Sequence, residues 1–197
     1  MNKTIFTAQH GEDIVLAEIF NRQDGTCVEV GGYDGVNLSN TLFFEKFGWN
    51  CIVIEPIPEL SEKIRQERNC KVIEAAATSE SGQIDFFVAE GVEVLSTCAN
   101  SKVELERIEL AGANTRKITV ESMKLDEILE HQDIESIDFI TIDVEGGELS
   151  VLQGFSLEKY KPRIIIVEDN NLVVDYSVRN YLKKFGYVHF KRTGCNE

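Results

Sequence analysis

Short apolar runs recur along the chain, and most of them end at a glycine or a carboxylate. These runs span residues 27–30, 51–55, 71–77, 137–143 and 163–167. Short apolar runs bounded by turn residues are typical of parallel strands that are covered on both faces. The segments between and around them predict helices, either from their apolar spacing or from capping residues. These segments are 11–21, 37–47, 56–68, 125–131, 148–153 and 175–185.

This alternation of strands and helices predicts an α/β fold built on a doubly wound, mostly parallel sheet with helices on both faces. Residues 83–89 and 117–123 alternate between apolar and polar and are expected to form strands, the first in an edge hairpin. Residues 187–192 predict a last strand. The stretch 90–116 is weakly periodic and rich in Gly, Asn, Ser and Thr, so we expect a loop or lid that closes over an acceptor.

Length and charge narrow the classes of function. The 197 residues fit a single domain, 1–197, and no run reaches the roughly 18 apolar residues of a membrane span. The N-terminus is too polar for a signal peptide, and the odd number of cysteines, five, suits reduced thiols, so we expect a cytoplasmic protein. The net charge of −14 argues against nucleic acid and acidic membranes as partners.

A glycine turn follows the first strand, and an acid follows the second. Gly31 and Gly35 belong to the turn, and Glu55 lies 20 residues beyond it, which is the arrangement that holds a nucleoside by its ribose hydroxyls. The spacing fails the G-x-G-x-x-G pattern of a dinucleotide site, and Glu29 and Asp34 would repel a pyrophosphate. A nicotinamide-dependent oxidoreductase is therefore disfavoured. The acids suit the ammonium and sulfonium of S-adenosylmethionine.

From Gln9 to Glu168 the chain resembles the FkbM family of S-adenosylmethionine-dependent O-methyltransferases. The segments that carry the resemblance are QHGED (9–13), VEVGGYDG (28–35), SNT (39–41), GW (48–49), IEP (54–56), IDFITIDVEG (137–146) with Glu148, and VLQG (151–154). The resemblance implies a Rossmann-like methyltransferase sheet and transfer of a methyl group to a hydroxyl of a sugar, free or in a glycosylated acceptor. Sheets of this type end in an antiparallel hairpin, whereas here one predicted strand is followed by five residues. The chain is thus either a compact version that lacks the last antiparallel strand or one domain of a longer polypeptide.

The resemblance also implies a set of residues for the cofactor. The turn would bind it and Glu55 would accept both ribose hydroxyls. Asn37 and Ser39 would contact the methionine carboxylate, the adenine would lie beyond the third strand, and Asp143 would lie beside the methyl group. The full cofactor set is Glu29, Gly31, Gly32, Tyr33, Gly35, Asn37, Ser39, Glu55, Pro56, Ala76 and Asp143.

Three acids at or just beyond strand ends are candidates for the base that deprotonates a hydroxyl: Asp143, Glu145 and Glu168. A second set, made of Asp143, Asp169 and Asn170, resembles the magnesium site of catechol-type O-methyltransferases, and oxygen ligands suit Mg²⁺. The alternative is that residues 169–171 only cap the next helix. We expect Glu148 to hold the turn at Gly146 rather than to contact substrate.

Two other functions stay open for the same sheet. One is a small-molecule N-methyltransferase, which has no need of a strong base. The other is a non-catalytic adenosyl-binding module that has lost its acceptor site.

Overall fold

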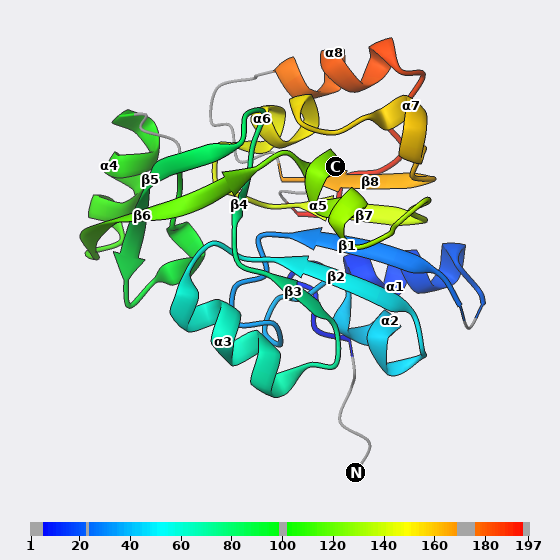
Figure 1. Cartoon of the computed structure of the whole chain (residues 1–197), viewed down its shortest axis with the longest axis horizontal. Coiled ribbons are helices and arrows are strands. Elements are labelled where there is room, and N and C mark those ends of the chain that lie inside the picture. Colours follow the sequence, from blue (N-terminus) through cyan, green and yellow to red (C-terminus); the bar gives the residue numbers. More distant parts are fainter. Residues whose placement is uncertain (1–5, 23, 99–101, 169–175, 195–197) are drawn as a thin grey trace.

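The computed structural model describes residues 6–22, 24–98, 102–168 and 176–194, and its helices and strands largely alternate (Figure 1). In chain order the elements are α1 (Glu12–Ile19), β1 (Thr26–Val30), α2 (Leu42–Lys46), β2 (Asn50–Ile54), α3 (Pro58–Glu67), β3 (Lys71–Ile73), β4 (Ala76–Ala77), β5 (Gly82–Glu90), the 3₁₀ helix η1 (Glu93–Leu95), α4 (Lys102–Leu110), β6 (Asn114–Met123), α5 (Leu125–His131), β7 (Phe139–Ile142), α6 (Glu148–Gln153), α7 (Leu157–Tyr160), β8 (Ile164–Val167) and α8 (Ser177–Lys184).

The central sheet consists of five parallel strands in the order β3-β2-β1-β7-β8. Val28 of β1 pairs with Ile52 on one side and with Ile140 on the other. The chain builds β1, β2 and β3 in one direction and then returns to β7 beside β1. In such a sheet the carboxyl ends of the strands at the point of reversal form the usual ligand crevice. The predicted α/β class and parallel sheet are confirmed.

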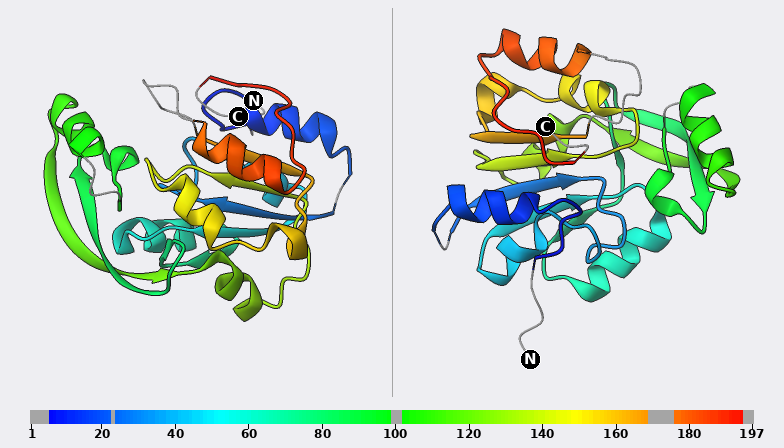
Figure 2. Two further views of the ribbon diagram at one scale, coloured as in Figure 1. Left: turned by 90° about the horizontal axis from the view of Figure 1, so that it is seen from above. Right: turned by 180° about the vertical axis from the view of Figure 1, so that it is seen from behind.

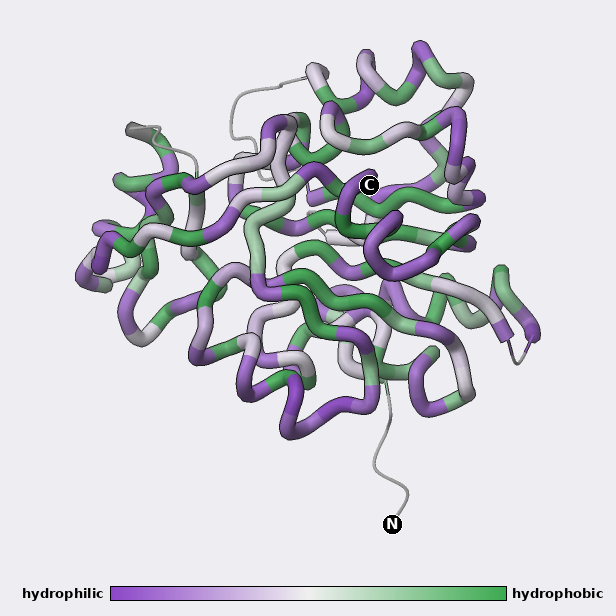
Figure 3. Tube along the Cα trace, in the orientation of Figure 1, coloured by the Kyte–Doolittle hydropathy of each residue, from purple (hydrophilic) through white to green (hydrophobic). Residues whose placement is uncertain are grey.

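Helices cover both faces of this sheet, as expected. Val28, Ile52 and Ile140 face one side and pack with apolar residues of α5, α6 and α7. Cys27, Cys51 and Phe139 face the other side and pack with α1 and α2. The left view of Figure 2 shows α1 and α5 on opposite sides of the strands, and Figure 3 shows the hydrophobic residues concentrated in those strands. The side chains of β1, β2 and β7 are therefore buried on both faces of the sheet, which explains their unbroken apolar runs.

A second, smaller sheet changes the prediction for residues 90–116. Its order is β4-β6-β5, with a long antiparallel pair of β5 and β6 that extends beyond the central sheet toward α4 (Figure 1). The expected loop contains η1, α4 and the start of β6 instead. Helix α4 escaped detection because it buries mainly Ile108, while Val103 and Leu110 are exposed, so it has almost no apolar periodicity.

Other elements also differ from the prediction. The third strand is split, because β3 ends at Ile73 and the chain then crosses to pair β4 with β6. Residues 187–192 are not a strand; Val188 and Phe190 are 84% and 75% exposed, so the alternation does not correspond to a buried face. Helix α2 begins at Leu42, later than expected, and α7 was not predicted. In the described part of the chain, none of the helices is long and apolar enough to cross a membrane.

Candidate active site

A cavity of about 260 Å³ lies at the carboxyl ends of the central strands. Residues of the second sheet, such as Phe86 of β5, and of the segment from η1 to α4 complete its wall. Ten of the eleven predicted cofactor residues line it: Glu29, Gly31, Gly32, Tyr33, Asn37, Ser39, Glu55, Pro56, Ala76 and Asp143. The structure thus brings the acids after β1, β2 and β7 to one place. Gly35 is the exception, and it packs against α3.

The glycine turn after β1 is shaped by close packing. A Cβ on Gly31, which has a φ of 89°, would lie 1.8 Å from the backbone carbonyl of Asp143. A Cβ on Gly32 would lie 2.3 Å from Val53. Tyr33 also adopts a left-handed φ of 47°. Only glycine at position 31 allows the turns after β1 and β7 to approach this closely. Gly31 and Gly32 both line the cavity.

Glu55 directly follows β2 and is almost fully buried. Its carboxylate accepts hydrogen bonds from the backbone N–H groups of Tyr33 and Ile57, both at 2.9 Å. Burial raises the pKa of Glu55 to about 7, and the backbone donors limit the rise. The backbone N–H of Gly32 also lowers this pKa. A carboxylate has about four lone-pair positions, so at least one remains for a ligand hydroxyl.

The carboxylate of Glu29 has several hydrogen-bond and ion-pair partners within the protein. Its carboxylate accepts the hydroxyls of Ser39 (2.8 Å) and Thr41 (2.5 Å) and the backbone N–H of Asn40 (2.6 Å). It also pairs with Arg68 at 3.3 Å. Oε2 receives the two hydroxyls and Arg68, and Oε1 receives the N–H of Asn40. Glu29 thus fixes the 39–41 segment against the end of β1.

Arg68, just beyond the end of α3, is the centre of this network and was not predicted from the sequence. Its side chain is fully buried and pairs with Glu29 and, at 2.8 Å, with Glu45. It also donates to the carbonyl of Gly35 and to the hydroxyls of Ser39 and Thr41, over 3.0–3.2 Å. The guanidinium therefore ties both ends of the 35–41 segment to α3.

Asn37 and Ser39, which were predicted to contact the methionine carboxylate, form hydrogen bonds with other residues of the protein. Asn37 donates through its side-chain amide and its backbone N–H to Asp34, both at 2.8 Å. Ser39 donates to Glu29 and accepts from Arg68 and from the N–H of Leu42. Both residues line the cavity, but these polar groups already have partners.

The end of the cavity beyond β3 is largely apolar. Ala75, Ala76 and Ala77 line it, together with Ile57, Phe86 and Leu95. Ala76, Ile57 and Phe86 belong to one buried apolar cluster. Small and aromatic side chains at this end offer a surface suited to a flat, apolar ring such as a purine base.

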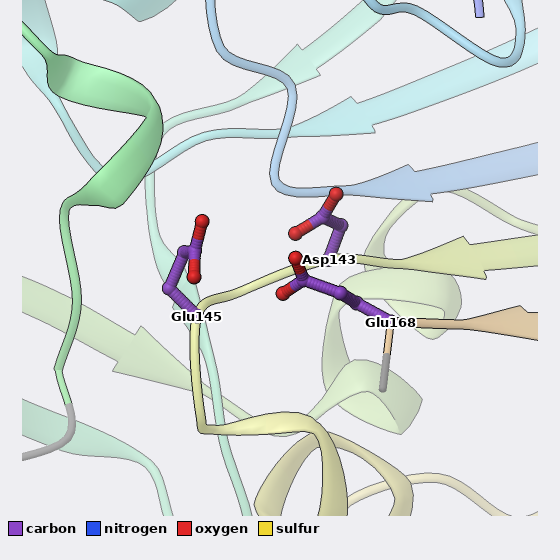
Figure 4. Close-up of side chains that lie close together, drawn as sticks. All are labelled: Asp143, Glu145 and Glu168. Carbon is purple, nitrogen blue, oxygen red and sulfur yellow. The ribbon is translucent and has the colours of Figure 1, made fainter. Parts of the chain in front are cut away.

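Asp143, Glu145 and Glu168 converge at the opposite end, after β7 and β8 (Figure 4). Carboxylate oxygens of the three, one from each residue, lie within 4.8 Å of one another. Burial raises the pKa of Glu168 well above its usual value, and the neighbouring Asp143 carboxylate adds to this rise. Glu168 thus holds a proton at neutral pH and shares it with Asp143 through a hydrogen bond. Burial also raises the pKa of Glu145 to about 7, against the effect of Arg107.

Arg107 of α4 also reaches this cluster and was likewise missed. Its guanidinium lies 2.6 Å from Glu145 and 2.8 Å from Glu104. The hydroxyl of Thr97 donates to the carbonyl of Glu145 at 2.7 Å. These contacts hold Glu145 at a left-handed φ of 54°. Backbone strain of this kind is often found at functional sites.

Glu148 holds the same turn from α6, as expected. Its carboxylate accepts the backbone N–H groups of Val144 and Gly146, at 3.2 and 3.0 Å.

The predicted magnesium ligands Asp169 and Asn170 lie outside the described residues. Within the described part, Asp143, Glu145 and Glu168 provide a group of oxygen donors that could hold a hard divalent cation.

Comparisons with known proteins identify relatives of this chain. Residues 29–188 match the profile of the family described as "Methyltransferase FkbM domain". The 2-O-methyltransferase NoeI of Sinorhizobium fredii (strain NBRC 101917 / NGR234) is 23% identical over 163 residues, covering 78% of this chain and 66% of that protein. The crystal structure of methyltransferase FkbM from Methylobacillus flagellatus KT shares the fold with a TM-score of 0.54 at 16% identity. That match covers 82% of this chain and 37% of the other.

Proposed function

Because this chain belongs to the FkbM methyltransferase family, we propose that it transfers the methyl group of S-adenosylmethionine to a hydroxyl of a sugar or glycosylated acceptor. The observation that carries the proposal is the surplus of acidic over basic side chains in the cavity, which remains although Glu168 is protonated and Glu145 pairs with Arg107. Six acids line the cavity: Glu29, Glu55, Glu93, Asp143, Glu145 and Glu168. Among the described lining residues, Arg107 alone is cationic. Such a surface suits a ligand with ammonium and sulfonium charges and repels a pyrophosphate.

The cofactor would extend along the ends of the strands. The adenine would lie against Ala76 and Phe86, and the ribose hydroxyls would donate to Glu55. The sulfonium would then lie over the glycine turn, close to Asp143. This placement uses the apolar end of the cavity for the base and the acid-rich end for the charged groups.

Methyl transfer to oxygen needs alignment and removal of one proton. Bound S-adenosylmethionine supplies an activated methyl group, which the acceptor oxygen takes as the carbon–sulfur bond breaks and its electron pair stays on sulfur. Fixing the two reactants in line supplies much of the rate. The hydroxyl proton would pass to Asp143 or Glu145, while the protonated Glu168 would donate a hydrogen bond to Asp143 and so stabilise the ionised form of that carboxylate. An amine acceptor has no need of three acids at this position, which favours a hydroxyl over the N-methyltransferase alternative.

The acceptor class rests on the relative named 2-O-methyltransferase and on the family resemblance. The test is turnover of S-adenosylmethionine with a panel of glycosides, for the wild type and for Asp143→Asn. We expect the variant to bind S-adenosylhomocysteine with little change and to lose most of its turnover. A fully active variant would refute the role of Asp143, and wild type without binding of either adenosyl ligand would refute the function. Turnover with and without a chelator, followed by added Mg²⁺, tests the magnesium site.

A further inference from the structure

The surface formed by residues 176–194 differs in charge from the rest of the chain. These residues comprise α8 and the segment after it, and they include five bases and no acid. The whole chain, in contrast, has 34 acids and a net charge of −14. We call this surface the α8 face. Its bases, of which all but the first are exposed, are Arg179, Lys183, Lys184, Lys191 and Arg192.

The α8 face also exposes large apolar side chains. Tyr176, Phe185, Val188 and Phe190 are all exposed, and Val188 and Phe190 are the most exposed of the four. A single exposed apolar residue is common on a protein surface, but a group of them beside positive charges is typical of an interaction site. The face therefore has the composition of a docking surface.

Helix α8 and the segment after it lie side by side. Arg179 and Lys183 of the helix line the same cavity as Val188, Phe190 and Lys191 of the segment. The left view of Figure 2 shows the helix and the segment next to each other on one surface. The bases and the apolar side chains are thus neighbours in space as well as in sequence.

The cavity that they share is large and mainly apolar. Its volume is about 780 Å³, which lies within the range of ligand pockets. Its apolar walls come from α1, β8 and α8 and include Val15, Ile19, Ile165, Val167, Val178 and Leu182. Acids also line the cavity, but none of them is exposed: Glu12, Glu104, Glu148 and Glu168.

An anionic phospholipid offers both kinds of group that this face can bind. Its phosphate attracts Lys and Arg side chains, and its acyl chain buries apolar side chains such as Val188 and Phe190. The cavity gives room for part of an acyl chain beside them. A nucleic acid supplies phosphates without an aliphatic chain, so it would leave Val188 and the cavity uncovered.

The net charge of the whole chain argues against acidic membranes, but docking depends on the charges that lie close to the lipid. Interactions between exposed charges are largely screened beyond about 8 Å at physiological salt. Acids on other faces therefore act weakly on a membrane in contact with the α8 face, whereas the exposed bases of this face act at short range.

We propose that the α8 face docks this protein onto a bilayer that contains anionic phospholipids. Val188 and Phe190 enter the boundary between headgroups and acyl chains, and the lysines of the face lie at the level of the phosphates. Glu168 lines both this cavity and the cavity of the candidate active site, so the docked face adjoins that site. The proposal goes beyond the proposed function, because docking needs neither the cofactor nor the acceptor.

Sedimentation with lipid vesicles tests the proposal. One set of vesicles contains equal amounts of phosphatidylcholine and phosphatidylglycerol, and the other contains phosphatidylcholine alone. Two double variants alter the face. Val188→Ser with Phe190→Ser removes the apolar side chains, and Lys184→Glu with Lys191→Glu reverses two charges. Neither pair belongs to the candidate active site, so binding of S-adenosylhomocysteine should be unchanged in both.

Two control variants carry the same kinds of change elsewhere. Val103→Ser with Leu110→Ser removes two apolar side chains that are exposed on α4. Lys46→Glu with Lys124→Glu gives the same net charge through two exposed positions outside the face. Thermal melting checks that each variant is folded.

We expect the wild type to bind the mixed vesicles at least about tenfold more tightly than phosphatidylcholine alone, since several exposed bases lie near the anionic surface. Added salt should weaken this binding. Each face variant should lose at least about tenfold in binding to the mixed vesicles, whereas both controls should bind like the wild type.

Three results would overturn the proposal: no binding of the wild type to mixed vesicles, equal binding to both kinds of vesicle, or face variants that bind as well as the controls. A wild type that binds no vesicles and self-associates in analytical ultracentrifugation, with Val188→Ser and Phe190→Ser restoring the monomer, would assign the face to a second copy instead. If one face variant does not fold, the other decides. A wild type that docks on vesicles but does not bind S-adenosylhomocysteine would refute the proposed function and leave this inference standing.

Discussion

Replacing Arg68 by methionine tests whether the buried network below the glycine turn stabilises the fold. Methionine keeps the apolar stem and removes the guanidinium. Glu29 and Glu45, whose side chains are 4% and 7% exposed, then lose their buried counter-charge. Removing one partner of a buried ion pair costs about 3–5 kcal/mol. Because a domain is stable by only about 5–15 kcal/mol, this loss is at least about a fifth of the total.

The assay is equilibrium unfolding in urea, supported by thermal melting. At this chain length about 2–4 °C is lost per kcal/mol, so Tm should fall by about 6–20 °C. The matched control is Arg65→Met in the last turn of α3, three residues before Arg68. Arg65 is 39% exposed and pairs with Glu62 and Glu74 at the surface, where ion pairs contribute about 0–1 kcal/mol. If the two variants lose the same stability, the central role of Arg68 is wrong. The double variant Arg68→Met with Glu29→Gln should recover part of the loss, since it removes one of the two uncompensated charges.

Three other predictions concern the cavity. Glu55→Ala should weaken S-adenosylhomocysteine by about 1.5–3 kcal/mol in calorimetry, as for hydrogen bonds to a charged group; unchanged binding would refute the ribose contact. Burial raises the pKa of Glu55 to about 7, so wild-type affinity should fall as the pH drops through 7 and the carboxylate gains a proton. Glu55→Ala should lack this pH dependence, and a variant that keeps it would assign the titration elsewhere. Gly31→Ala should destabilise the fold by at least about 2 kcal/mol more than Gly91→Ala in urea unfolding. Both glycines have a left-handed φ, but only a Cβ at position 31 would meet a backbone carbonyl, at 1.8 Å. Equal losses of stability would contradict the close-packing argument.

The central sheet could be predicted because its strands are buried on both faces, so each is a continuous apolar run ended by a turn. The second sheet could be predicted only in part. Strands β5 and β6 alternate and were found, but α4 buries mainly Ile108 and has no regular apolar face. The strand predicted at 187–192 is absent, because the sequence alternates there although neither set of side chains is buried. Alternation is informative only where one set of side chains is covered, and Val188 and Phe190 are not.

The acids of the candidate site could be predicted from chain order alone, because strand ends of a parallel sheet meet at one edge. The residues that pair with these acids could not be predicted from the sequence. Arg68 follows a surface helix in a run of charged residues, and nothing in that run distinguishes it from Arg65, yet only Arg68 is buried beneath the turn. The same limit applies to Asn40, which resembles any polar loop residue until its amide oxygen is found buried and unpaired. A carboxylate at a strand end indicates where a ligand lies. Which of its hydrogen bonds are left for that ligand depends on groups that arrive from other elements, and here Arg68 and the 39–41 segment take up most of those of Glu29.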